Sequence, residues 1–104
     1  MSNIQSVAQY FVIIAEQKEK DKFLSLLGEY GAKAIETIYG KGSMSPSVIA
    51  SAFGFEAQQN KVVISCLLRT ERAEQLIKVL YNDYNFSKPN TGIAFSVAVE
   101  GLAF

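Results

Sequence analysis

The chain has no histidine and only one cysteine, Cys66, among its 104 residues. The usual zinc sites need histidine or several cysteines, and Ser-His-Asp or Cys-His catalysis needs an imidazole base. A lone cysteine forms no internal disulfide, and no charged segment followed by a long apolar run opens the chain. These absences argue against transition-metal capture and common nucleophilic enzymes, and they predict a cytoplasmic protein in which Cys66 is a buried core residue.

The chain also lacks an excess of charge of either sign and any long hydrophobic run. Ten Lys and Arg residues balance ten Asp and Glu residues, so the formal net charge is zero. Without a basic surplus to neutralise phosphates, nucleic acid is not an expected partner. The longest apolar run, 10–15, is far shorter than the roughly 20 residues that cross a bilayer, so the sequence predicts no membrane span.

The length of 104 residues and the 49% share of apolar residues are typical of one small globular domain, which spans residues 1–104. Hydrophobic periodicity predicts the order strand, helix, strand, strand, helix, strand. The expected strands are 10–15, 32–39, 61–68 and 91–99, the expected helices are 19–30 and 71–84, and 1–8 is a loose leader. Gly31 is expected to end the first helix, and Gly28 inside it indicates close packing or early fraying.

This order is that of an α+β, ferredoxin-like fold, in which a four-stranded antiparallel sheet carries two helices on one face. The other face then needs a cover, and a second copy of the chain would supply it. The last strand has one bulky and one small face, since Ile93, Phe95, Val97 and Val99 alternate with Gly92, Ala94, Ser96 and Ala98. Small side chains let a ligand or a helix approach closely, and a packed helix is the simpler explanation.

Two segments carry a more specific pattern. Tyr39-Gly40-Lys41-Gly42 ends the second expected strand and precedes a long loop, 40–60. Lys88-Pro89-Asn90-Thr91-Gly92-Ile93-Ala94-Phe95 leads into the last expected strand. In these segments and their places the chain resembles the nitrogen regulatory PII family and its PII-like relatives, over roughly residues 9 to 102.

The resemblance implies a homotrimer that binds small anionic ligands, often adenine nucleotides, in clefts between subunits. Residues 40–60 match the family's T-loop, which signals to a transporter, an enzyme or a regulator, and residues 85–91 match its B-loop, which cradles phosphates. The protein would then be a regulator rather than an enzyme. It would need no cofactor, and its effector would be an adenine nucleotide or bicarbonate.

The residues of both segments suit an anion. Gly40 and Gly42 permit positive φ angles and leave N–H groups unshielded, while Lys41 and Lys88 supply positive charge. Lys61 stands near the position of a family lysine close to the oxoacid, although an exposed lysine at a strand start is the simpler explanation. The expected ligand-binding residues are Gly40, Lys41, Gly42, Ser43, Lys61, Leu67, Lys88, Pro89, Asn90, Thr91 and Gly92.

The loop 40–60 is unusually apolar for a connection. Its residues Val48, Ile49, Phe53 and Phe55 are candidate partner-binding residues, and a short helix at 47–53 packed on its own trimer is the alternative. The chain departs from the ATP-binding members, because 97–104 contains no basic residue and Ser43-Met44 begins the loop.

Three other hypotheses remain. A CutA-like metal-tolerance trimer shares the general fold, but the absence of histidine weighs against it. An acylphosphatase-type hydrolase would need an arginine and an asparagine near the first strand, and the sequence has neither there. An interaction module without any ligand stays open.

Overall fold

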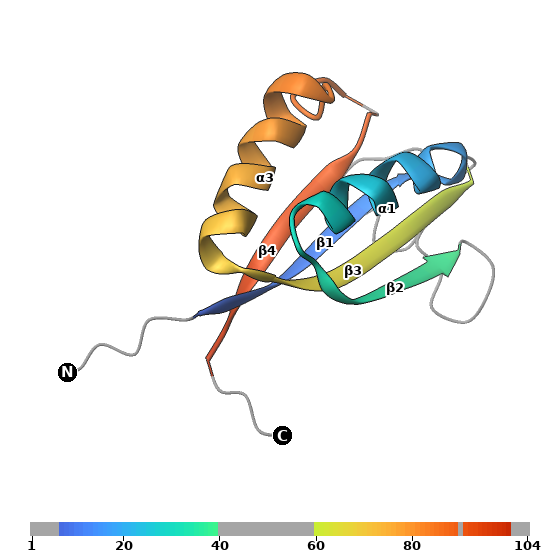
Figure 1. Ribbon diagram of the computed structural model, residues 1–104. Coiled ribbons are helices and arrows are strands. Elements are labelled where there is room, and N and C mark those ends of the chain that lie inside the picture. The colour runs from blue at the N-terminus through green and yellow to red at the C-terminus, as the bar shows by residue number, and fades with distance from the viewer. Residues whose placement is uncertain (1–6, 40–59, 90, 101–104) are drawn as a thin grey trace.

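The computed structural model describes residues 7–39, 60–89 and 91–100. The elements are β1 (Ala8–Glu16), the short 3-10 helix η1 (Gln17–Glu19), α1 (Lys20–Glu29), β2 (Lys33–Tyr39), β3 (Lys61–Arg69), α3 (Thr70–Asp83) and β4 (Ile93–Val99). The described strands form one antiparallel sheet in the order β2-β3-β1-β4, with both helices on the same face (Figure 1). The expected α+β, ferredoxin-like fold is therefore confirmed.

The strand bounds differ slightly from the expected ones. β1 begins at Ala8, the last residue assigned to the leader, because Ala8 pairs with Arg69 on β3 and with Val99 on β4. Residues 1–6 and the short helix expected at 47–53 lie outside the described residues. No helix in the described part of the chain is long and apolar enough to cross a membrane.

The main core lies between the sheet and the two helices. It takes alternate residues of the inner strands and one stripe of each helix, which are Phe11, Ile13, Ala15, Phe23, Leu26, Leu27, Val62, Ile64, Cys66, Leu68, Ala73, Leu76 and Leu80. Cys66 is 1% exposed, and burial raises the pKa of its thiol to about 11. The expectation that Cys66 is a core residue is confirmed, and a thiol with this pKa is inert at neutral pH.

The opposite side of the sheet, here called the open face, carries the alternate residues of the same strands. Tyr10 lies between Leu67 on β3 and Val97 on β4, and the pairs continue along the strands through Val12 and Ile14. Val12, Ile14 and Val63 form a second buried cluster, and Ile93 and Phe95 pack against it. Tyr10 is nevertheless 45% exposed and Val97 is 53% exposed, so large apolar side chains reach the surface on this face.

β2 contains an irregularity that strict alternation does not predict. Lys33 pairs with Leu67 and Glu36 with Ser65, so β2 has one residue more than β3 between these two pairs. Ala34 within this bulge has φ 54°, an uncommon conformation for a residue with a side chain. The bulge puts Lys33 on the same face as Glu36, whereas alternation would place the two on opposite faces.

α1 ends at Glu29, and Gly31 just beyond it terminates the helix, as expected. Gly31 has φ 78°, its N–H donates to the Gly28 carbonyl, and the N–H of Ala32 donates to the Leu27 carbonyl. This is the Schellman arrangement, which favours glycine at the left-handed position. Gly28 has only open space around the position of a Cβ, so close packing does not explain it.

The two glycines predict opposite responses to alanine. Gly28→Ala should raise the free energy of unfolding by about 0.5–1 kcal/mol, because alanine loses less backbone entropy in a helix. Gly31→Ala should lower it by about 1 kcal/mol or more, because its backbone is left-handed. A Cβ meets no atom within 4 Å at either site, so the pair isolates the backbone effect. Urea titrations measure the free energy of unfolding of both variants, and a change of the same sign and size in both would contradict this prediction.

Candidate functional site

One end of the sheet gathers most of the expected ligand-binding segments. β1 and β2 end there and β3 and β4 begin there, as shown by the pairs Glu16 with Lys61, Tyr39 with Val62, and Ile14 with Ile93. Lys61 and the turn before β4 therefore lie at the same end of the sheet as the last residue of β2. The expected residues Gly40, Lys41, Gly42, Ser43 and Asn90 lie outside the described residues.

The sheet order separates these segments across its width. β2 and β4 are the two edge strands, with β3 and β1 between them (Figure 1). Three strand spacings of about 4.8 Å put the edges roughly 14 Å apart. Leu67 is six residues along β3 from Lys61, which is about 20 Å in an extended strand. One chain thus does not bring Leu67, the end of β2 and the turn before β4 together.

The turn between α3 and β4 is built by local hydrogen bonds. Asn85 has φ 64°, the N–H of Phe86 donates to the Leu80 carbonyl at 3.1 Å, and the N–H of Lys88 donates to the Asn85 carbonyl at 2.9 Å. The hydroxyl of Thr91 donates to the Pro89 carbonyl at 3.5 Å. Lys88 and Pro89 are exposed on this turn, so the ammonium group of Lys88 is available to an anion.

Phe86 anchors the turn to the core. Its ring packs edge-on against Phe23 of α1, with 5.5 Å between ring centroids. A Cβ on Gly92 would lie 2.3 Å from the nearest carbon of the same ring, so Gly92 lets the ring reach the backbone at the start of β4. Sequence reasoning missed Phe86, and the only signal was an aromatic residue inside an otherwise polar turn.

Lys61 is not the exposed strand-start lysine that was the simpler expectation. It is 1% exposed, because β3 is an inner strand and its first residue pairs with Glu16 of β1. The Gln17 side-chain amide donates to the Lys61 carbonyl at 3.2 Å, and the Gln17 backbone N–H donates to the Asn60 carbonyl at 3.0 Å. This end of β3 is thus covered by the chain that follows β1.

A second contact missed by sequence reasoning holds the end of β2. The ammonium group of Lys20, at the start of α1, donates a hydrogen bond of 2.8 Å to the Tyr39 hydroxyl. This hydrogen bond lowers the pKa of Tyr39 and raises the pKa of Lys20. The contact ties the residue before Gly40 to the first turn of α1, with Tyr39 41% exposed.

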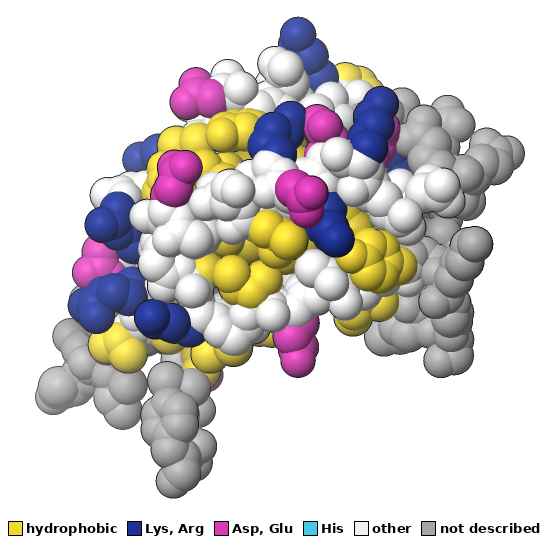
Figure 2. Space-filling view, turned by 45° about the vertical axis from the view of Figure 1, so that its right-hand side comes forward, with side chains coloured by type: hydrophobic (Ala, Val, Ile, Leu, Met, Phe, Trp, Pro, Cys, Tyr) yellow, Lys and Arg dark blue, Asp and Glu magenta, His cyan; other side chains and the backbone are white. Residues whose placement is uncertain are grey.

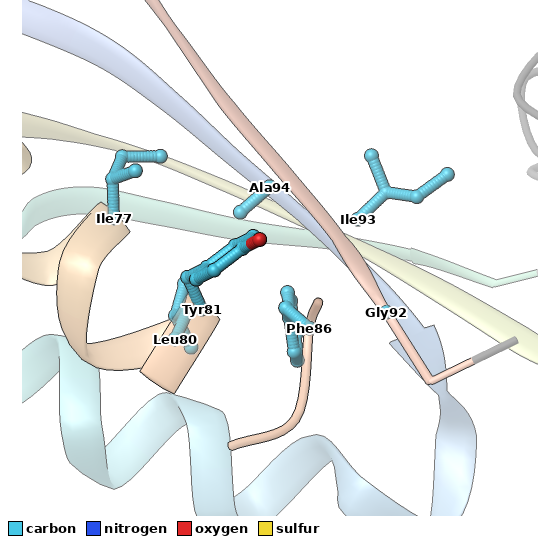
Figure 3. A pocket seen from close by; sticks show the side chains of 7 residues that line it. All are labelled: Ile77, Leu80, Tyr81, Phe86, Gly92, Ile93 and Ala94. Atoms are coloured by element: carbon cyan, nitrogen blue, oxygen red, sulfur yellow. The ribbon is translucent and has the colours of Figure 1, made fainter. Parts of the chain in front are cut away.

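A small pocket of about 220 Å³ lies between α3 and the start of β4. Its lining residues are Ile77, Leu80, Tyr81, Phe86, Gly92, Ile93 and Ala94. Figure 3 shows Ile77, Tyr81 and Phe86 on one side of β4 and the side chain of Ile93 on the other. Ligand pockets usually measure about 300–1,000 Å³, so this one is too small for a whole nucleotide.

The described residues on one face of the molecule carry charges of both signs. On the face shown in Figure 2, Lys and Arg side chains are interspersed with Asp and Glu side chains, and apolar side chains are exposed between them. Among the described residues, no three His, Cys, Asp or Glu side chains are grouped as metal ligands would be.

Comparison with protein-family profiles and with curated proteins gave no match. Among solved structures, the chain is similar to CPII from Thiomonas intermedia K12, a nitrogen regulatory PII-like protein, bound to ADP, AMP and acetate. The identity is 17% and the TM-score is 0.68, over 97% of this chain and 94% of CPII. CPII bound to ADP and bicarbonate matches at 20% identity with a TM-score of 0.57, over 90% of this chain and 89% of CPII.

Two other organisms provide similar structures. A candidate PII-like signaling protein from Thermus thermophilus matches at 16% identity with a TM-score of 0.63, over 92% of this chain and 90% of that protein. A functionally unknown protein from Pediococcus pentosaceus matches at 8% identity with a TM-score of 0.60, over 95% and 98% of the two chains. The fold that the resemblance implied is the fold of these proteins.

The Phe86 contact predicts that Gly92→Ala is destabilising. The added methyl group overlaps the Phe86 ring, so the free energy of unfolding should fall by about 1–3 kcal/mol. Phe86→Leu should relieve this overlap, and the double variant should lose less stability than the sum of the two single variants. Denaturant unfolding of all four proteins measures the coupling. Strict additivity would show that the ring does not pack on Gly92.

Proposed function

We propose that the protein is a non-enzymatic, PII-like regulator whose effector is a small anion, an adenine nucleotide or bicarbonate. The observation that carries this proposal is the fold match over 97% of the chain to CPII bound to ADP, AMP and acetate. The match to CPII bound to ADP and bicarbonate supports the second choice of effector. The chain adds its own chemistry, because an anchored turn presents Lys88 to solvent.

The effector would bind between two copies of the chain. The end of β2 and the turn before β4 stand at opposite edges of one sheet. A ligand that contacts both segments therefore needs β2 of one copy beside β4 of the next. A cyclic arrangement satisfies this condition for every copy, and a homotrimer is the arrangement that the family resemblance implies.

The open face supports self-association independently. Tyr10 and Val97 are direct cross-strand neighbours there, and both are about half exposed. Leu67, on the other side of Tyr10, is also partly exposed. An exposed apolar patch on one face of a sheet is more often covered than solvated in a stable protein. We propose that the open face of another copy of the chain packs against this patch.

Regulation would follow from differential contact with the effector. Lys88, Lys41 and the backbone N–H groups of both segments would gather the anionic oxygens, since charge-assisted hydrogen bonds are the strong ones. The segment 40–60 begins directly after Tyr39, so the effector would favour one of its conformations. A partner such as a membrane transporter or an enzyme would recognise that conformation through Val48, Ile49, Phe53 and Phe55.

Lys88→Ala should weaken effector binding. The loss of one charge-assisted contact, about 1.5 kcal/mol, corresponds to roughly a tenfold higher dissociation constant for AMP, ADP or bicarbonate. Lys78→Ala is the matched control, because Lys78 is an exposed lysine of α3 outside the turn. Isothermal titration calorimetry compares the three proteins. The assignment of the turn is wrong if Lys78→Ala and Lys88→Ala change the affinity equally.

The open face predicts a sharp difference between two neighbouring residues of β4. Val97→Asp places a carboxylate beside Tyr10 on the open face, and it should convert the homotrimer into monomers. Ala98→Asp places the same charge on the helix side of the strand, where Ala98 is exposed, and it should leave the trimer intact. Light scattering gives the mass of each variant. A wild-type monomer, or a Val97→Asp trimer, would contradict the proposed interface.

A further inference from the structure

The pocket between α3 and β4 has a lining that the proposed anion contacts do not use. Ile77 and Leu80 of α3 form one wall, the Phe86 ring forms another, and Ala94 faces them from β4. Tyr81 is 59% exposed, and its ring lies toward Ala94 beside the Phe86 ring (Figure 3). An opening lined by two aromatic rings and aliphatic side chains favours an apolar occupant.

A small residue makes this space. Ala94 stands on the side of β4 that faces the helices, where a larger side chain would fill the gap between β4 and α3. The position beside Gly92 is already taken by the Phe86 ring. The sequence pattern of a small face on the last strand thus has a specific consequence here. Ser96 and Ala98 continue that face but do not line the pocket. The room is confined to the start of the strand, next to the turn.

The volume limits the size of the occupant. Apolar cavities of about 150 Å³ hold one benzene molecule, and this pocket measures about 220 Å³. One flat ring or a fused pair of rings suits this space, whereas a sugar and a phosphate group would have to project from it. Lys88 is only two residues from Phe86, so a charged group that projects from the pocket lies near the exposed lysine of the same turn.

We propose that this pocket binds one flat, uncharged aromatic ring. The ring has two possible sources, the base of a nucleotide effector or a free aromatic compound. A nucleotide base as the occupant rests on the proposed function. It would restrict the effector to anions that carry a ring, and so would select a nucleotide over bicarbonate. A free aromatic compound as the occupant is independent of the proposed function. It would be a second ligand, in contact with the Phe86 ring that anchors the turn.

Methyl NMR of the full chain tests the proposal with four probes, which are AMP, adenine, indole and ribose 5-phosphate. A ring seated in the pocket shifts the methyl signals of Ile77 and Ala94 through its ring current. Ile38, on the opposite edge strand β2, is the internal reference. The three ring compounds should shift the two pocket signals in a saturable way. Ribose 5-phosphate should leave both in place.

Two variants make the test specific. Ala94→Val narrows the pocket and should weaken ring binding at least tenfold, as read from Ile77. Ala98→Val adds the same methyl groups on the same side of β4 but outside the pocket, and it should change ring binding less than twofold. Tyr81→Ala removes one ring of the lining at an exposed position, so it should weaken binding without loss of the fold. Tyr81→Phe should retain binding.

The outcomes separate this proposal from the proposed function. Shifts with indole and adenine but not with AMP would support the pocket as a site for a free aromatic compound. Shifts with indole in a protein that binds neither AMP, ADP nor bicarbonate by calorimetry would support the pocket and contradict the proposed function. If calorimetry shows AMP binding but no ring compound shifts the methyl signals of Ile77 and Ala94, the pocket is not a ring-binding site. The proposed function would not be contradicted by this result. Equal weakening by Ala94→Val and Ala98→Val would also overturn the pocket as a ring-binding site.

Discussion

The two-sided pairing of β1 is the contact on which the rest of the structure depends. β1 is hydrogen-bonded to β3 along one side and to β4 along the other, and five consecutive residues, 11–15, are buried. Alternate side chains of this strand enter both the helix-side core and the open-face cluster. A run of apolar residues without alternation is what residues 11–15 require, because their side chains are buried on both faces of the sheet.

This arrangement dictates where functional segments lie. Because β1 and β3 occupy the middle, β2 and β4 become the edges, and the end of β2 and the turn before β4 are kept a sheet width apart. A compact site that needs both the end of β2 and that turn is therefore incomplete in one chain. Tyr10 of β1 and Val97 of the edge strand β4 are exposed beside each other on the open face. The separation of these two places and the exposed apolar patch are independent physical arguments for the proposed assembly.

The helix layer reaches the candidate site through aromatic side chains. Phe23 of α1 contacts both Tyr84, at 5.7 Å between centroids, and Phe86, at 5.5 Å. Phe86 in turn packs on Gly92 and lines the pocket. The turn that carries Lys88 is thus held by the core through one ring rather than by charge. A change in that ring's position would move the turn, so an occupant of the pocket would be coupled to the anion that we propose the turn binds.

The sequence by itself determined the order and type of the strands and α-helices, the burial of Cys66, the termination of α1 by Gly31, and the fold class. These features depend on local periodicity, on short apolar runs and on backbone freedom at one glycine, all of which are properties of neighbouring residues. The resemblance in the segments at 39–42 and 88–95 also indicated the fold that the CPII structures share.

Only the tertiary structure decided the remaining features, because each depends on residues distant in sequence. Lys61 is buried since β3 became an inner strand, and the bulge at Ala34 follows from matching β2 to β3. Leu67 lies far from Lys61 because strand length separates them, although both were expected at one site. The roles of Phe86, Gly92 and Lys20 arise from contacts between α1, the turn and the strand ends. Side chains from separate elements meet only when the sheet has formed, and no local pattern records that meeting.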